Sequence, residues 1–308
     1  MVTTYCQINQ MDGCLLEWLR QQPLGEPIGV VHSIFDKVIN FIAVDGSMLF
    51  SLAKNEVSQS PGMMRTLENN IFSKMGASLI PTKSIYLVDK NLLQIGNWQW
   101  EFSNANIWNR GLRLQHYQTK LLTTSSLLRL NQFILENGAT GGMFSAWKSV
   151  TYPHWKLPDD QEKNIYFPLF KNGLEQLKQE IKANKLHKFY LKFAGLGIGL
   201  TPSGDDFLTG LLATWQYFDA SLYKKVEKCN TDWLQQLKRR TTTISYFMLK
   251  QCLEGQVNEA LLDVLDNLDG NPIPYLRRIL AIGSTSGTDM LTGVSFAYQQ
   301  LIDYKEEK

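Results

Sequence analysis

The feature that most constrains this chain is an eight-residue segment that occurs twice, 83 positions apart. Residues 203–210 read SGDDFLTG and residues 286–293 read SGTDMLTG, so six of the eight positions are identical. Each copy opens a stretch with helical periodicity, which predicts two equivalent helix starts. The glycine that ends each copy, Gly210 or Gly293, allows two helix backbones to approach closely. Such a repeat indicates a pseudo-twofold arrangement with a shared site or a shared packing axis.

A glycine-rich run leads into the first copy. Gly195, Gly197 and Gly199 permit backbone conformations and close approaches that a Cβ atom prevents. We expect Thr201 to be the N-cap of the following helix and Pro202 to be its first residue. Unpaired amides of the first helical turn, together with the helix dipole, then favour an anionic group such as phosphate or carboxylate.

The predicted anion site takes its donors from hydroxyl groups and glycine amides near both copies. The residues that we assign to it are Gly197, Gly199, Thr201, Ser203, Gly204, Thr242, Thr243, Ser286 and Gly287. Lys192, just before the glycine run, is a further candidate phosphate partner, although a solvated lysine is the simpler interpretation. The four histidines show no nucleophile or metal-ligand spacing, and we assign them no role.

Three aspartates at the helix starts, Asp205, Asp206 and Asp289, are the candidate catalytic residues. Asp206 follows Ser203 by three residues and Asp289 follows Ser286 by three, a spacing that also matches a capping box. Capping alone stabilises a helix by about 0.5–2 kcal/mol. Two adjacent acids exceed what capping needs, so we also expect a carboxylate that accepts hydrogen bonds from substrate N–H groups.

Residues 1–105 have the character of a mainly antiparallel, barrel-like β domain. Residues 28–52 are rich in β-branched and aromatic residues, with turn signals at Asp36-Lys37 and Asp45-Gly46. Residues 84–88, 92–95 and 98–102 continue in the same style, whereas residues 58–63 read as a loop. We therefore expect a β-meander in this half of the chain.

Residues 106–308 change to helical periodicity and carry the repeat. We expect helices over residues 121–136, 172–184, 207–218, 232–253, 259–268, 275–281 and 289–304, and a long connection over 149–168. The predicted fold class is thus α+β, with an N-terminal β domain followed by a helical domain that contains an internal pseudo-repeat.

Composition excludes several other classes of protein. Of the 308 residues, 44% are hydrophobic and 19% are charged, and no stretch approaches the roughly twenty apolar residues of a membrane span. The first residues contain neither a basic region nor an apolar run, so we expect a cytoplasmic protein. A net charge of +2 gives no reason to expect nucleic acid. The cysteines lack metal-site spacing, and we expect no metal and no cofactor.

Residues 195–210, with the sequence GLGIGLTPSGDDFLTG, resemble the signature of the AllH family. The likeness extends through residues 241–245 to the second copy and covers about residues 185–297, while the β half is similar in general character. It implies a subunit of oxamate carbamoyltransferase, a transferase of allantoin breakdown in purine catabolism. This enzyme splits oxalurate with phosphate into oxamate and carbamoyl phosphate. The resemblance also implies FdrA-like and YlbE-like partner subunits, and it assigns no catalytic residue.

Three functions remain open from the residues themselves. A carbamoyltransferase subunit needs mainly to orient two reactants and to stabilise an oxyanion, which suits helix N-termini and hydroxyl donors. A non-catalytic anion-binding or assembly protein is the alternative, with the glycines holding helices together. A third possibility is a hydrolase that binds magnesium through Asp205, Asp206 and Asp289, because magnesium prefers carboxylate and water ligands.

Overall fold

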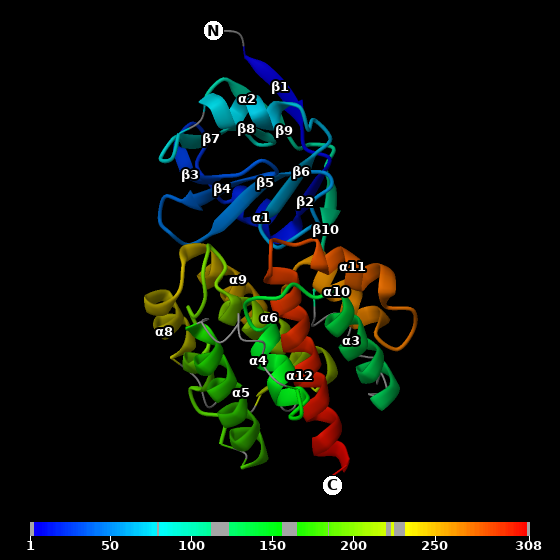
Figure 1. The fold of residues 1–308 in the computed structure, drawn as a ribbon. Helices are drawn as coiled ribbons and strands as arrows, with labels where there is room; N and C mark the ends of the chain where they lie inside the picture. Colours follow the sequence, from blue (N-terminus) through cyan, green and yellow to red (C-terminus); the bar gives the residue numbers. More distant parts are fainter. Residues whose placement is uncertain are drawn as a thin grey trace. The chain divides into compact units, whose positions relative to one another are not determined.

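The protein is described by a computed structural model that covers residues 3–78, 80–111, 123–155, 165–183, 185–219, 223–224 and 232–306. Its contacts divide the chain into two compact units, Met1–Arg110 and Gly111–Lys308 (Figure 1). The first unit is a curled mixed sheet and the second is helical, so the predicted α+β class is confirmed. The domain boundary placed after residue 105 stays a prediction.

The first unit is a ten-stranded sheet with the strand order β1-β9-β8-β7-β3-β4-β5-β6-β2-β10. The strands are β1 (Thr4–Gln7), β2 (Gln10–Asp12), β3 (Pro27–Ile34), β4 (Val38–Ala43), β5 (Leu49–Lys54), β6 (Met63–Thr66), β7 (Ser84–Asp89), β8 (Leu92–Ile95), β9 (Trp98–Glu101) and β10 (Asn106–Trp108). Strand pairs β1–β9, β5–β6 and β2–β10 are parallel, and the other six pairs are antiparallel. The expected antiparallel character is therefore correct.

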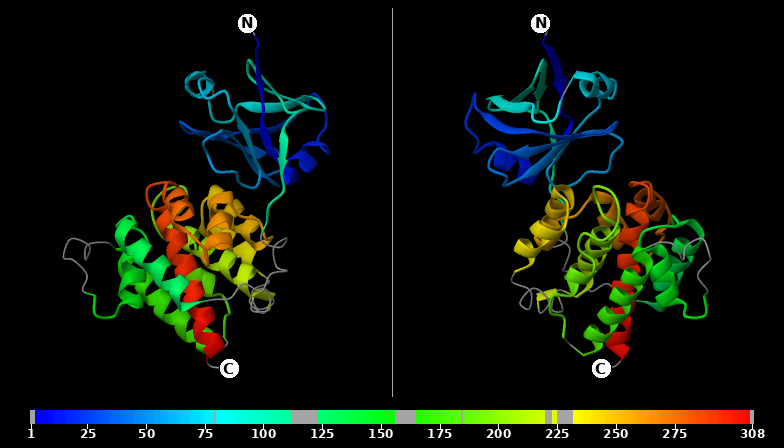
Figure 2. Two further views of the ribbon diagram at one scale, coloured as in Figure 1. Left: turned by 90° about the vertical axis from the view of Figure 1, so that its right-hand side faces the viewer. Right: turned by 60° about the vertical axis from the view of Figure 1, so that its left-hand side comes forward.

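The connection between β1 and β2 requires the sheet to curl. These strands lie near opposite ends of the strand order, yet Ile8 and Asn9 alone separate them along the chain. The amide of Ile8 donates to the carbonyl of Glu101 in β9, and the amide of Asn9 donates to the carbonyl of Arg65 in β6, at 2.8 and 2.9 Å. One short segment thus joins both ends of the sheet and closes it into a half-barrel, seen from two further directions in Figure 2.

The half-barrel encloses an apolar core, because alternate residues of its strands point inward. In β4 every second side chain is buried, and the ring of Phe41 stacks on Phe50 of β5 with centroids 5.2 Å apart. The described residues of this unit also form two helices, α1 (Gly13–Leu19) and α2 (Ile71–Ser78). The predicted hairpin turn at Asp45-Gly46 is present, whereas these two helices and the short strands β1, β2, β6 and β10 were not expected.

The second unit consists of helices around a central pair, α6 (Ser203–Phe218) and α12 (Ser286–Glu306). The surrounding elements are α3 (Thr124–Asn137), α4 (Phe144–Thr151), α5 (Tyr166–Lys182), the 3-10 helix η2 (Phe189–Lys192), α8 (Trp233–Arg240), α9 (Thr243–Leu253), α10 (Glu259–Asn267) and α11 (Ile273–Leu280). Fourteen of the sixteen residues of α6 are buried, which makes it the core helix. Across the described ranges, no helix is both long and apolar enough to cross a membrane.

Two predictions about this unit are wrong. The helix expected over residues 232–253 is two helices, because Thr241 is extended and Thr242 starts a new helix by accepting a hydrogen bond from the amide of Ser245. The connection expected over residues 149–168 begins inside α4, a short helix that was missed. Residues 156–164 of that connection, and residues 121–122 of the first expected helix, lie outside the described part of the chain.

Candidate functional site

Helices α6 and α12 touch backbone to backbone at the glycines that end the two repeats. A Cβ atom on Gly210 would lie 2.0 Å from the carbonyl oxygen of Met290, and one on Gly293 would lie 2.2 Å from that of Phe207. Met290 and Phe207 are equivalent positions of the repeat, so the same contact occurs twice with the copies exchanged. The close approach expected from the sequence is confirmed, and it gives the pair a pseudo-twofold axis.

Gly204 and Gly287 serve as a second pair of contact points. A Cβ atom would lie 2.1 Å from the carbonyl oxygen of Phe193 in the first case and 2.0 Å from that of Ile279 in the second. Their amides donate to the carbonyls of residues 196 and 282 at 2.9 and 3.1 Å. These two glycines are therefore explained by packing, and their amides are already bonded.

The first turn of α6 differs from the prediction. Pro202 is the N-cap and Ser203 the first helical residue, one position later than expected, and no side chain caps the helix. The amides of Asp205 and Asp206 both donate to the carbonyl of Pro202, at 2.8 and 3.2 Å. The expectation that several amides of this turn remain unpaired is thus wrong, because the turn is bonded to its own N-cap and to the preceding loop.

Unpaired amides lie instead in the glycine-rich loop before α6. Gly195, Gly197 and Gly199 all have positive φ, at 75°, 123° and 98°, which the loop requires in order to reverse direction. The amides of residues 197–201 form no hydrogen bond with any residue that the structure describes. The loop is open to solvent at its tip, where the side chain of Ile198 is 82% exposed. Oriented amides of this kind form anion-binding concavities.

Asp205 anchors this loop to the helix. Its carboxylate accepts hydrogen bonds from the amide of Gly195, at 2.9 Å, and from the hydroxyl of Thr241. Burial raises the pKa of Asp205, and hydrogen bonds from Thr241, Gly195 and Ser245 act in the opposite direction. The equivalent position in the second copy is Thr288, whose hydroxyl accepts from the amide of Ala139 at 3.0 Å. The two copies thus use one position to hold two different loops.

Asp206 and Asp289 face each other's repeat. Asp206 lies beside the hydroxyls of Ser286 and Thr201, and these two hydroxyls lie 3.1 Å from each other. Asp289 lies beside the hydroxyl of Ser203 and accepts a hydrogen bond from the amide of Met143 at 2.7 Å. Each aspartate of one copy therefore meets the first serine of the other copy, as the pseudo-twofold axis requires.

Both of these carboxyl groups are buried and incompletely paired. Neither oxygen of Asp206 forms a hydrogen bond of normal geometry with the described residues, nor does Oδ2 of Asp289. Burial raises the pKa of Asp206 well above its ordinary value, and the nearby Asp289 and Asp205 raise it further. Burial also raises the pKa of Asp289, to about 7. Burial thus favours the protonated form of Asp206, which is able to donate a proton or a hydrogen bond.

A third loop, residues 138–142, completes the surroundings of Asp289 and was missed in the sequence. Gly142 has φ of 49°, and a Cβ atom there would lie 2.4 Å from Oδ1 of Asp289 and 2.6 Å from Oγ of Ser203. Only glycine fits between these two groups. The adjacent pair Gly141-Gly142, directly before the apolar start of α4, is the signal that identifies this loop.

The start of α9 supports the glycine-rich loop from another side. Thr242 is the N-cap of α9, and its hydroxyl also donates to the carbonyl of Leu200. Thr243, the first helical residue, is exposed. Three of the predicted site regions, at the starts of α6, α9 and α12, therefore meet around one loop.

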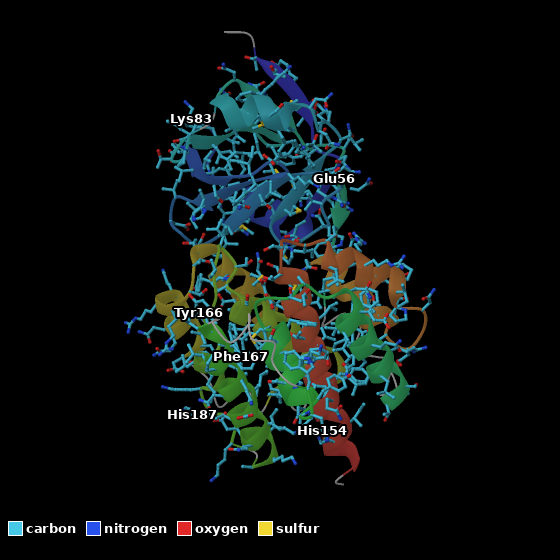
Figure 3. All side chains as sticks on the ribbon, in the orientation of Figure 1. Glu56, Lys83, His154, Tyr166, Phe167 and His187 are labelled. Atoms are coloured by element: carbon cyan, nitrogen blue, oxygen red, sulfur yellow. The ribbon has the colours of Figure 1, made fainter. Side chains whose placement is uncertain are left out.

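Other residues singled out in the sequence lie apart from this group. Lys192 forms an ion pair with Glu180 at 2.8 Å, which already satisfies its charge. His154 and His187 lie in the helical unit away from the end where α12 begins (Figure 3). Within the ranges that the structure covers, no three acidic, histidine or cysteine side chains converge as metal ligands would, so the alternative of a magnesium site at Asp205, Asp206 and Asp289 gains no support.

Two family models match the chain. One, described as "Oxamate carbamoyltransferase subunit AllH", matches residues 193–298, which include the glycine-rich loop and both repeats. The other, described as "AllH family N-terminal domain", matches residues 7–107, which form the half-barrel. No solved structure matches the chain.

Replacing Gly210 or Gly293 by alanine is expected to lower the free energy of unfolding of the helical unit by about 2 kcal/mol or more, since the new methyl group overlaps a carbonyl oxygen. Urea unfolding followed by circular dichroism measures this change. The control is Gly270→Ala, where the nearest atom is 3.8 Å away and an effect within about 0.5 kcal/mol is expected. Equal stability of all three variants would contradict the reciprocal contact.

The stability of the helical unit is expected to fall as pH rises from about 4 to about 7, because folded Asp289 retains a proton in this window that the unfolded chain has lost. Below this window Asp289 is protonated in both the folded and the unfolded chain. Above it Asp289 is ionised in both, and the loss in the free energy of unfolding stays constant. Asp289→Asn should reduce this slope in urea unfolding at several pH values, and the slope that remains comes from Asp206 and Asp205, whose pKa values are also raised. Asp303→Asn, on the same helix, should leave the full slope unchanged, and an identical slope in both variants would refute the assignment.

Proposed function

Because this chain belongs to the AllH family, we propose that it is a subunit of an oxamate carbamoyltransferase and contains the site that binds the small anionic substrate. The observation that carries this proposal is the buried, unpartnered carboxyl group of Asp206 beside the paired hydroxyls of Thr201 and Ser286. Packing alone does not require a buried carboxyl group at this position, whereas a transferase can use it to carry a proton.

In the proposed reaction, an oxygen of phosphate attacks the carbamoyl carbon of oxalurate. The bond from this carbon to the oxamate nitrogen breaks, and the proton of hydrogen phosphate moves to that nitrogen, which gives carbamoyl phosphate and oxamate. The reaction needs a site for an anion, donors for the tetrahedral oxyanion and a path for one proton.

The residues at the two helix starts suit these three tasks. The unpaired amides from Gly197 through Gly199 to Thr201 are the proposed anion site. The hydroxyls of Ser203 and Ser286 are the proposed oxyanion donors, with Thr243 at the exposed edge. Gly204, Gly287 and Thr242 hold the backbone that presents these groups.

The aspartates divide between proton transfer and support. Asp206, as a neutral acid, is proposed to give a proton to the leaving nitrogen and to recover one from phosphate. Asp289, with a pKa of about 7, is suited to share that proton. Asp205 is fully engaged with Gly195 and Thr241, so we propose that it positions the loop and takes no part in chemistry.

The same family assignment implies further subunits, and we propose FdrA-like and YlbE-like chains as the partners in a cytoplasmic complex of allantoin breakdown. A specific observation also supports a non-catalytic assembly role. The glycine-rich loop exposes two large apolar side chains, Ile198 at 82% and Leu200 at 44%, which suit contact with another protein. In that case the loop binds a partner and the ligand has no effect on the isolated chain.

Phosphate and carbamoyl phosphate are expected to raise the melting temperature of the chain by a few degrees, because a ligand that binds the folded state stabilises it by mass action. In the double variant Ser203→Ala with Ser286→Ala the loop amides remain, so the phosphate shift should persist and the carbamoyl phosphate shift should be reduced. Ser149→Ala, whose hydroxyl bonds within α4, is the matched control and should keep both shifts. A flat response of the unmodified chain to both ligands would count against the anion site and favour the assembly role.

Asp206→Asn is expected to lower kcat of the complex reconstituted with its partner subunits by about 10²–10⁴-fold, the usual contribution of a positioned acid or base. The KM for phosphate should change little, because the loop amides remain. Steady-state kinetics of phosphate-dependent oxalurate cleavage measures both quantities. An unchanged kcat would remove Asp206 from the chemistry while leaving the anion site to the thermal test.

A further inference from the structure

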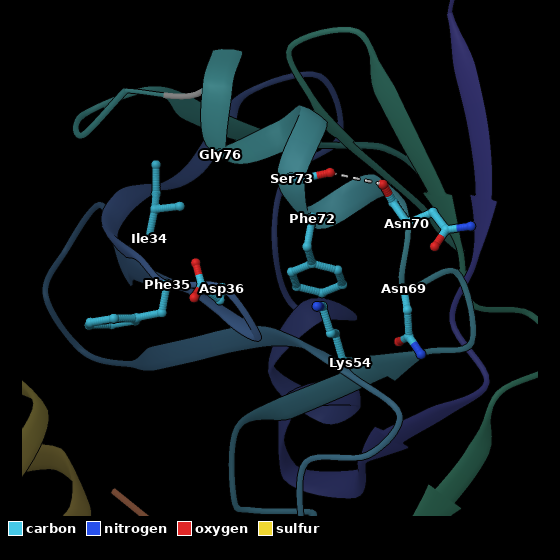
Figure 4. Close-up of a pocket in the computed structure, with 9 residues that line it drawn as sticks. All are labelled: Ile34, Phe35, Asp36, Lys54, Asn69, Asn70, Phe72, Ser73 and Gly76. Carbon is cyan, nitrogen blue, oxygen red and sulfur yellow. Dashed lines mark hydrogen bonds between the residues drawn. The ribbon is translucent and has the colours of Figure 1, made fainter. Parts of the chain in front are cut away.

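The half-barrel unit contains a cavity of about 850 Å³ that the proposed function does not use (Figure 4). It lies between the β3–β4 turn, the end of β5 and the start of α2. Its lining includes Phe35, Asp36, Lys54, Asn69 and Phe72. Its volume is in the range of small-molecule sites, and its walls combine aromatic, amide and charged groups as such sites do.

Lys54, the last residue of β5, supplies a cation to this cavity. Its Nζ lies 5.7 Å from the ring centroid of Phe72, which is itself 2% exposed and therefore fixed in the core. Lys54 forms no ion pair within the described residues, and the neighbouring Glu56 pairs with Lys37 at 2.9 Å. An aromatic ring thus positions the ammonium group, and no carboxylate of the described residues is paired with it.

Acceptor groups line other parts of the same cavity. Asp36, in the β3–β4 turn, brings a carboxylate, and Asn69 brings a side-chain amide from the segment before α2 (Figure 4). Phe35, beside Asp36, is 43% exposed and adds an apolar residue to the lining. A ligand that satisfies both the ammonium and the carboxylate must carry an anionic group and N–H donors.

From this arrangement we propose that the cavity binds a small organic acid that carries N–H donors, with its carboxylate on Lys54 and its N–H groups on Asp36 and the amide of Asn69. A ureido acid and an amino acid share this chemistry. The site lies in a different unit from the repeats, so it is independent of the proposed transferase site.

The test is a titration of the full chain with N-carbamoylglycine, glycine and acetate, followed by amide resonances of the β3–β4 turn and of α2. Saturable shifts with N-carbamoylglycine identify a ureido acid, and saturable shifts with glycine identify an amino acid. Acetate, which lacks N–H donors, should bind at least about tenfold more weakly, which is the effect of losing one charge-assisted hydrogen bond.

Lys54→Met, which keeps an unbranched side chain beside Phe72, should weaken binding by about tenfold or more. Lys90→Met removes an exposed lysine of the same unit that does not line the cavity, and it should leave the affinity unchanged. Asp36→Ala should weaken binding of the N–H-bearing acid and leave acetate unaffected. Absence of saturable shifts with both N–H-bearing acids, equal binding of acetate, or full affinity in Lys54→Met overturns the proposal.

Discussion

The backbone contact between α6 and α12 is the constraint on which the candidate site depends. Because Gly210 and Gly293 have no side chains, each helix lies against a carbonyl of the other. This contact sets the position of the first turn of one helix relative to that of the other. That placement brings Asp206 beside Ser286 and Asp289 beside Ser203. Burial at the crossing then raises the pKa of both carboxyl groups. Packing, geometry and proton affinity at this site thus have one physical origin.

The repeat allowed much of this arrangement to be predicted from the sequence. Identical residues at equivalent positions predicted two equivalent helix starts, and the terminal glycines predicted a close approach. The bonding of the first-turn amides was not predictable, because it depends on how the preceding loop folds back onto the helix. The break at Thr241 was missed because its flanking segments have helical periodicity, and a threonine N-cap is a weak signal inside such a run. The loop at Gly142 was missed because its partners, Asp289 and Ser203, are distant in sequence.

In the half-barrel, too, contacts between residues distant in sequence could not be predicted. Hairpin turns such as Asp45-Gly46 are local and were predicted, whereas the parallel pairs join segments far apart along the chain. Strand β10 has three residues, too few for a periodic pattern. The curl follows from the two-residue link between β1 and β2. This link predicts a curled sheet only when it is known that the two strands pair near opposite ends of the strand order. Short strands and distant pairings are therefore where sequence patterns carry least information.

The difference between Asp205 and Thr288 affects how a ligand would lie at the crossing. A strictly symmetric pair of helices presents the same groups on both sides of its axis and binds an unsymmetrical molecule equally well in two opposite orientations. Here one side carries an acid that holds the glycine-rich loop, and the other carries a hydroxyl that holds the loop before α4. This one difference makes the two sides of the pseudo-twofold axis chemically distinct. A molecule with two unlike ends therefore meets a different surface at each end and has one preferred orientation.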